Sequence, residues 1–64
     1  MIEVTTWADG AVVDRAEADD VESAVFAARV LWDELLDGGR RRFVRPQVEF
    51  RVDGELVLRL DRRP

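Results

Sequence analysis

The sequence predicts an α+β domain of ββαββ order, in which one helix lies across one face of a four-stranded antiparallel sheet. Asp-Gly pairs at residues 9–10 and 53–54 each lie between β-branched and apolar runs, which is typical of β-hairpins. Residues 19–37 carry apolar side chains at helical spacing, which indicates one helix between the hairpins. A chain of 64 residues is expected to form a single domain, 1–64, and we predict the strand order 2-1-3-4.

The first hairpin is predicted over residues 2–16. Its first strand is rich in β-branched residues, and the Asp-Gly pair marks the turn. We expect the same three-residue loop in this hairpin as in the second hairpin. It pairs Glu3 with Arg15 and Thr6 with Val12.

The helix is predicted over residues 19–37. Asp19 is the expected N-cap, because Glu22 follows three residues later and completes a capping-box pattern. Glycines at 38–39 are expected to end the helix, since glycine readily takes the left-handed cap conformation. The predicted core stripe contains residues at i, i+3, i+4 and i+7 spacing: Val21, Ala24, Val25, Ala28, Leu31, Trp32 and Leu35.

The second hairpin is predicted over residues 46–61. Pro46 lacks an N–H donor and suits the start of a strand. A two-residue loop would place Phe50 opposite Val57 and split the apolar side chains between both faces. We therefore expect a three-residue loop at 52–54. The pairs that follow are Phe50–Leu56, Val48–Leu58, Arg51–Glu55 and Arg45–Asp61.

The two hairpins resemble each other in sequence. Five residues recur 44 positions later, as Val4/Val48, Asp9/Asp53, Gly10/Gly54, Val13/Val57 and Arg15/Arg59. Shared hairpin chemistry explains this recurrence most simply. A duplicated ββ unit stays open as an alternative.

The composition restricts the possible chemistry. The chain has no cysteine and no histidine, and every basic residue is arginine. Neither a disulfide framework nor a cysteine-based zinc site is expected. The arginine-rich, lysine-free composition suggests a bacterium with a GC-rich genome, or its phage. No apolar run is long enough to span a membrane, and we expect a cytoplasmic protein.

No motif in the sequence predicts catalysis. His, Cys, Lys and Tyr, which supply most general bases and nucleophiles, are all missing. Asp33 and Asp37 lie one helical turn apart, but two carboxylates alone make a weak metal site. We expect a solvated acidic cluster there, neutralised by Arg40, Arg41 and Arg42. The chain is thus expected to be no enzyme and to hold no metal or cofactor.

The charge is unevenly distributed, which leaves nucleic-acid binding as an alternative function. Residues 1–39 carry ten acids and two Arg, a net charge of −8, whereas residues 40–64 carry four acids and eight Arg, a net charge of +4. Basic and aromatic residues alternate in one short run, as in nucleic-acid-binding segments. This run contains Arg40, Arg41, Arg42, Phe43 and Arg45.

Two surfaces are predicted to make protein contacts. The sheet face away from the helix is expected to present Trp7, Val13 and Val57 with several Arg, the composition of an interface hot spot. The back of the helix is expected to expose Phe26 and Val30. The residues proposed for contacts are Trp7, Phe26, Val30, Arg15, Arg51 and Arg59. The leading hypothesis is a small non-enzymatic accessory protein that forms a homodimer and binds an unidentified protein partner.

Overall fold

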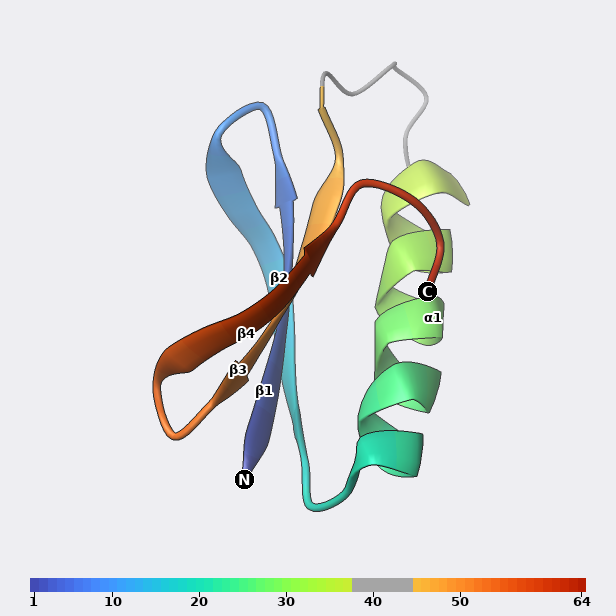
Figure 1. Cartoon of the computed structure of the whole chain (residues 1–64). Coiled ribbons are helices and arrows are strands. Elements are labelled where there is room, and N and C mark those ends of the chain that lie inside the picture. Colours follow the sequence, from blue (N-terminus) through green and yellow to red (C-terminus); the bar gives the residue numbers. More distant parts are fainter. Residues whose placement is uncertain (38–44) are drawn as a thin grey trace.

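The chain folds as a four-stranded antiparallel sheet with one helix on one face, as the sequence predicts (Figure 1). A computed structural model describes residues 1–37, without the side chain of Asp37, and residues 45–64. The observed strand order, β2-β1-β3-β4, confirms the predicted order. The elements are β1 (Ile2–Ala8), β2 (Ala11–Ala18), α1 (Val21–Asp37), β3 (Gln47–Val52) and β4 (Glu55–Leu60).

Both hairpins turn on two residues, so the predicted three-residue loops are wrong. Asp9 and Asp53 have φ of 55° and 52°, and the glycine after each also has positive φ. Positive φ at both central positions defines the tight turn that matches the twist of the flanking strands. As a result Glu3 lies opposite Glu17, and Phe50 lies opposite Leu58. None of the pairs predicted from three-residue loops forms in this register.

A β-bulge in each hairpin explains why the predicted register failed. The pairing shifts between Thr6 and Trp7 in the first hairpin and between Phe50 and Arg51 in the second. The shifts leave Val13 and Val57 as the extra residues, 44 positions apart. Each bulge restores the alternation that an unbroken two-residue hairpin would lose. The recurrence seen in the sequence therefore corresponds to a shared backbone geometry.

The helix N-cap lies one residue later than predicted, and α1 itself begins at Val21. The carboxylate of Asp20, not Asp19, accepts the backbone N–H of Ser23 at 2.7 Å, and the N–H of Ala24 donates to the Asp20 carbonyl at 3.0 Å. This hydrogen bond from Ser23 lowers the pKa of Asp20. The later cap lets β2 extend to Ala18, beyond the predicted end of the hairpin at residue 16.

The core lies between α1 and the helix-facing side of β1, β2 and β3. Five positions of the predicted helical stripe are buried, and Val4 and Val48 are fully enclosed beneath them. Ala16 and Ala18 lie on the helix-facing side of β2 and are small, which lets the helix lie close to that strand. The buried cluster consists of Val4, Ala18, Ala24, Ala28, Leu31, Trp32, Val48 and Phe50.

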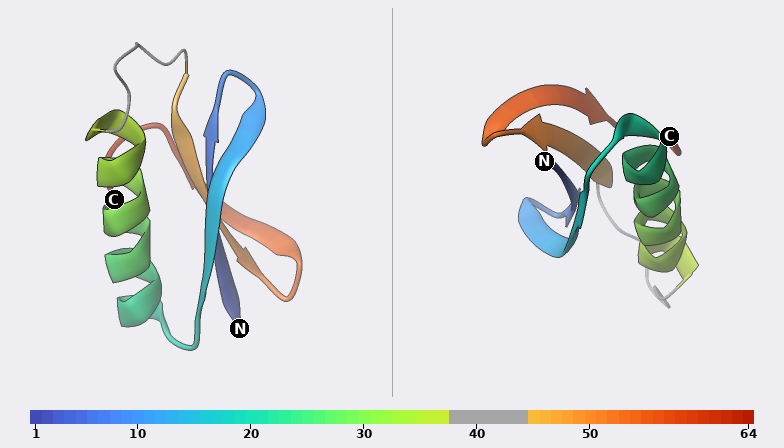
Figure 2. Two further views of the ribbon diagram at one scale, coloured as in Figure 1. Left: turned by 180° about the vertical axis from the view of Figure 1, so that it is seen from behind. Right: turned by 90° about the horizontal axis from the view of Figure 1, so that it is seen from below.

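The β3–β4 hairpin turns away from the helix. The two views in Figure 2 show α1 beside β2, while the turn of the second hairpin lies far from it. The helix contacts β1, β2 and part of β3, and no Cα of β4 lies within 8 Å of one in α1. The N-terminal end of the predicted stripe is consequently uncovered, and Val21 is 70% exposed.

Candidate interaction surfaces

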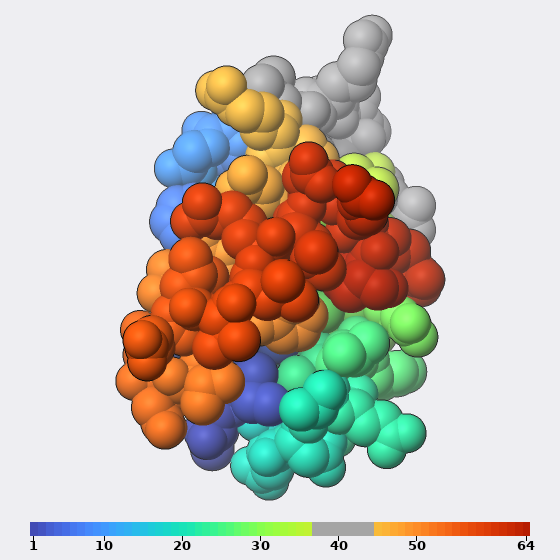
Figure 3. Space-filling view, viewed as in Figure 1, coloured from blue at the N-terminus to red at the C-terminus, as the bar shows by residue number. Residues whose placement is uncertain are grey.

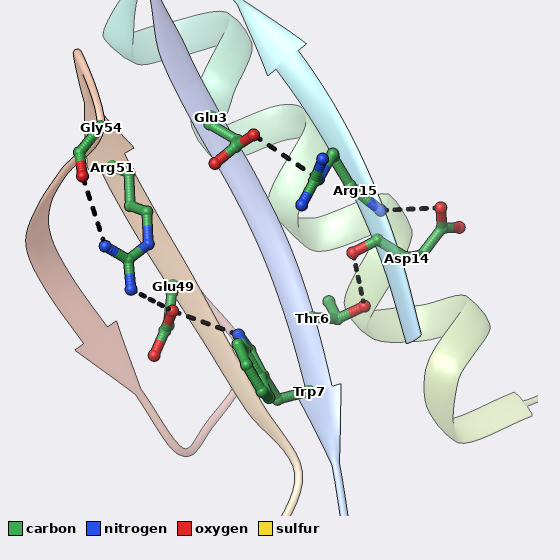
Figure 4. Close-up of polar contacts among 8 residues, drawn as sticks. All are labelled: Glu3, Thr6, Trp7, Asp14, Arg15, Glu49, Arg51 and Gly54. Atoms are coloured by element: carbon green, nitrogen blue, oxygen red, sulfur yellow. Dashed lines mark hydrogen bonds and ion pairs between the residues drawn. The ribbon is translucent and has the colours of Figure 1, made fainter. Parts of the chain in front are cut away.

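A buried carboxylate organises the sheet face away from the helix. Glu49, on β3, is only 3% exposed, and its Oε1 accepts the indole N–H of Trp7 at 3.1 Å and a guanidinium N–H of Arg51 at 3.3 Å (Figure 4). Its Oε2 binds Nε and Nη2 of Arg59, both at 2.9 Å. Two cations and one neutral donor thus satisfy this carboxylate, as burial of a charge requires.

Three of the predicted contact residues meet at this carboxylate. The sequence predicted that a protein partner would contact Trp7, Arg51 and Arg59. In the structure each of these side chains instead binds the carboxylate of Glu49. Arg15 lies apart, 3.5 Å from a carboxylate oxygen of Glu3. Glu49 was not among the contact residues predicted from the sequence. A signal was present, because a two-residue turn with a bulge places Glu49 directly opposite Arg59.

The back of the helix exposes two of the predicted contact residues. Phe26 is 70% exposed and Val30 is 40% exposed. The two lie one turn apart on the face opposite the core. Single exposed apolar residues are common on protein surfaces, so these two alone do not define a binding site.

The segment after β4 returns to the helix, as the position of the C-terminus in Figure 1 shows. Arg63 forms two hydrogen bonds to the Asp33 carboxylate, at 2.9 and 3.1 Å, and Nε of Arg29 donates to the Pro64 carbonyl at 2.9 Å. The hydrogen bond from Arg63 lowers the pKa of Asp33. Asp33 is therefore neutralised by Arg63, whereas the sequence predicted Arg40–Arg42, which lie outside the described residues.

An apolar groove opens where the second hairpin leaves the helix. Figure 3 shows a hollow between the β3–β4 hairpin and the first turns of α1, with the start of β1 at its floor. The groove has a volume of about 190 Å³. It is lined only by apolar residues: Ile2, Val21, Ala24, Val25, Phe50, Val52, Val57 and Leu58. Val57, which was predicted to lie on the opposite sheet face, instead lines this helix-side groove because of the bulge.

A second hollow lies at the far end of β4 and has a different character. Its volume is about 400 Å³, and its lining is largely polar and charged. Both of its arginines are already paired with acids. Arg59 binds Glu49, and Arg62 lies 3.6 Å from Asp61. The guanidinium groups in this hollow therefore already have carboxylate partners and do not indicate an anion-binding site.

The described part of the chain contains no group of three His, Cys, Asp or Glu side chains placed to hold a metal ion. Ser23 is an exposed residue in the first turn of the helix, and Asp33 is bound to Arg63. The side chain of Asp37 and the run Arg40, Arg41, Arg42 and Phe43 lie outside the described residues, whereas Arg45 is described and exposed.

Within residues 1–37 and 45–64, no helix is long and apolar enough to cross a membrane. Comparisons with protein-family models, with curated proteins and with solved structures gave no match. Functional inference for this chain therefore rests on its own surfaces.

Proposed function

We propose that the chain is a non-enzymatic protein-interaction module and that the groove between α1 and the β3–β4 hairpin is its contact surface. The observation that carries this proposal is the uninterrupted apolar lining of the groove. Val21 and Val57 line this groove, and 70% and 62% of their surfaces are exposed. Clustered apolar exposure on a small domain is typical of a binding site.

The size of the groove favours a protein partner over a small molecule. Pockets for small ligands usually have volumes of about 300–1,000 Å³ and contain a few polar groups that orient the ligand. This groove has a volume of about 190 Å³ and no polar lining residue. It suits one or two apolar side chains projecting from a folded or folding segment.

The arginines favour a protein partner over nucleic acid. Arg51 and Arg59 bind the buried Glu49, and Arg63 binds Asp33. A phosphate backbone would have to compete with these carboxylates for the same guanidinium groups. The nucleic-acid alternative would then depend on Arg40–Phe43 together with Arg45, and a salt-sensitive affinity lost on replacing these Arg with Ala is its specific test.

We propose in addition that two copies meet through the same groove. Both outer strands of the sheet carry a bulge, at Val13 and at Val57. Bulges at sheet edges disfavour pairing with another strand, so contact through the groove is the better route to a dimer. A two-fold arrangement would place the exposed Val57 of each copy over the groove of the other.

Peptide selection tests the groove directly. A displayed random-peptide library is selected on the folded domain, and the peptides are re-tested on two matched double variants. Val21→Ser with Val57→Ser alters the groove, whereas Val12→Ser with Val13→Ser alters two valines on β2 that are also exposed. We expect binding to be lost only with the groove variant. Peptides that bind both variants equally, or no enrichment, would contradict the proposal.

Sedimentation velocity over a concentration series tests the dimer separately. We expect the wild-type mass to rise above that of a monomer with concentration, and the groove variant to stay monomeric. The β2 variant should behave like the wild type. A wild-type chain that stays monomeric at high micromolar concentration would remove self-association from the proposal and leave the peptide result to decide on the groove.

A further inference from the structure

Three acidic residues are direct sequence or strand neighbours of residues that line the apolar groove. Glu22 lies one position after Val21 and about one turn before Val25, two residues of α1 that line the groove. Asp53 follows Val52 in the turn, and Glu55 is paired directly opposite Val52, so that both point to the same face. All three acids are exposed.

Glu22, Asp53 and Glu55 form the acidic rim of the groove. The positive groups next to this rim do not cancel its charge. The Met1 ammonium lies 3.9 Å from Oδ1 of Asp53, and both groups are largely exposed. Arg51 reaches the Gly54 carbonyl at 3.5 Å, but its guanidinium already binds Glu49. Three carboxylates against one ammonium leave the rim acidic.

The shape of the groove indicates what kind of segment fits. The helix α1 covers the sheet over β1 and β2, and the groove continues that same layer towards β4. Exposed sheet faces in layered folds are normally covered by helices that present an apolar stripe. Docking of an amphipathic helix in a hydrophobic groove is an established mode of peptide recognition.

We infer that the groove binds a basic amphipathic helix of a protein partner, with its apolar residues in the groove and its Lys or Arg side chains on the acidic rim. The inference rests on the proposed function and adds the chemistry of the partner. A second copy of this chain is disfavoured as the tightest occupant, because a two-fold dimer brings Glu22, Asp53 and Glu55 of both copies together. Like charges facing each other across an interface lower affinity.

Three labelled synthetic peptides of about 18 residues, roughly five helical turns, test this inference by fluorescence anisotropy. The first carries Leu at i, i+3, i+4 and i+7 spacing with Lys elsewhere. The second has the same Leu residues with Glu in place of Lys, and the third keeps Lys but has Ser in place of Leu. We expect the first to bind at least about tenfold more tightly than either other peptide, with an affinity that falls as salt screens the rim.

Two charge-matched protein variants locate the binding. The rim variant should bind the Leu–Lys peptide about tenfold more weakly, because each exposed ion pair contributes only a modest share. The control variant removes the same number of acids elsewhere and should stay within about twofold of the wild type. The rim variant is Glu22→Gln, Asp53→Asn and Glu55→Gln, and the control is Asp14→Asn, Glu17→Gln and Glu34→Gln.

The outcomes separate the inference from the proposed function. Equal weakening by both charge variants, or tight binding of the Ser–Lys peptide, would overturn the inference in favour of non-specific attraction. If the Leu–Glu peptide binds as tightly as the Leu–Lys peptide, and Val21→Ser with Val57→Ser abolishes both, the groove proposal stands and the inference fails. If that groove variant changes the affinity of no peptide, the proposed function fails as well.

Discussion

The two hairpins share a backbone design, but the helix covers both strands of the first hairpin and only part of β3 in the second. Both turn on Asp-Gly with positive φ, and both bulge at a valine, Val13 or Val57. In the first hairpin, Ala16 and Ala18 face the helix on the outer strand. In the second, Leu58 and Leu60 occupy the helix-facing side of the outer strand.

This difference shows which apolar residues the fold itself uses. Small alanines on β2 let α1 approach, whereas no Cα of β4 lies within 8 Å of one in α1, and Leu60 of β4 is only partly buried against the core. Leu58 remains 47% exposed and Val57 62% exposed. Folding therefore leaves large apolar side chains exposed on β4. Burial of this exposed apolar area by a second molecule would contribute favourable free energy to binding.

The largest expected effect contrasts one valine in each hairpin. Val4 is fully buried, so Val4→Ala should lower the free energy of unfolding by about 2–3 kcal/mol through lost burial and a residual cavity. Val57→Ala, at an exposed site, should cost less than about 0.5 kcal/mol. Urea unfolding measures both. Equal losses would show that the second hairpin is packed as tightly as the first.

A smaller effect contrasts the acids on the far sheet face. Glu49→Gln should destabilise the domain by about 1–2 kcal/mol, because two arginines lose a buried anionic partner. Glu3→Gln removes the 3.5 Å pair with Arg15 in the first hairpin and should cost about 0.5 kcal/mol or less. Thermal unfolding of the two variants shows which substitution lowers the stability more. If Glu3→Gln is the more harmful change, our assignment of Glu49 as the structural centre is wrong.

The helix cap gives an effect of about 1 kcal/mol. Asp20→Ala should destabilise the domain by that amount, because the N–H of Ser23 loses its acceptor. Asp19→Ala, one residue earlier, serves as the matched control and should be close to neutral. Chemical denaturation of both variants tests where the helix begins. A larger loss for Asp19→Ala would restore the helix start predicted from the sequence.

The smallest effect concerns the segment that ties the second hairpin to the helix. Arg63 lowers the pKa of Asp33 in the folded state, below the ordinary value of about 3.9. The stabilisation is thus complete above that ordinary value and is lost as the pH falls through the lowered folded-state pKa. Asp33→Asn should be slightly less stable than the wild type at pH 7, and the difference should shrink in strong acid. A difference that does not depend on pH would exclude this ion pair as its cause.

The sequence predicted the fold but not the surfaces. Helical spacing and Asp-Gly turns were sufficient for the ββαββ order and for most of the core. The predicted register failed because a two-residue turn with a bulge and a three-residue loop both keep the apolar residues on one face, so the alternation alone does not distinguish them. The exposure of Val21 depends on how far the second hairpin turns from the helix, which periodicity does not encode. Glu49 was missed because its burial follows from the corrected register.

Methyl NMR provides the most direct test of the claim that the open hairpin, rather than the covered one, receives a partner. The wild-type domain is titrated with the Leu–Lys peptide while valine and leucine methyl signals are followed. We predict that the methyl signals of Val21, Val57 and Leu58 shift with saturation, while those of Val12 and Val13, which are also exposed, stay in place. Shifts centred on Val12 and Val13, or spread evenly over both hairpins, would contradict the account.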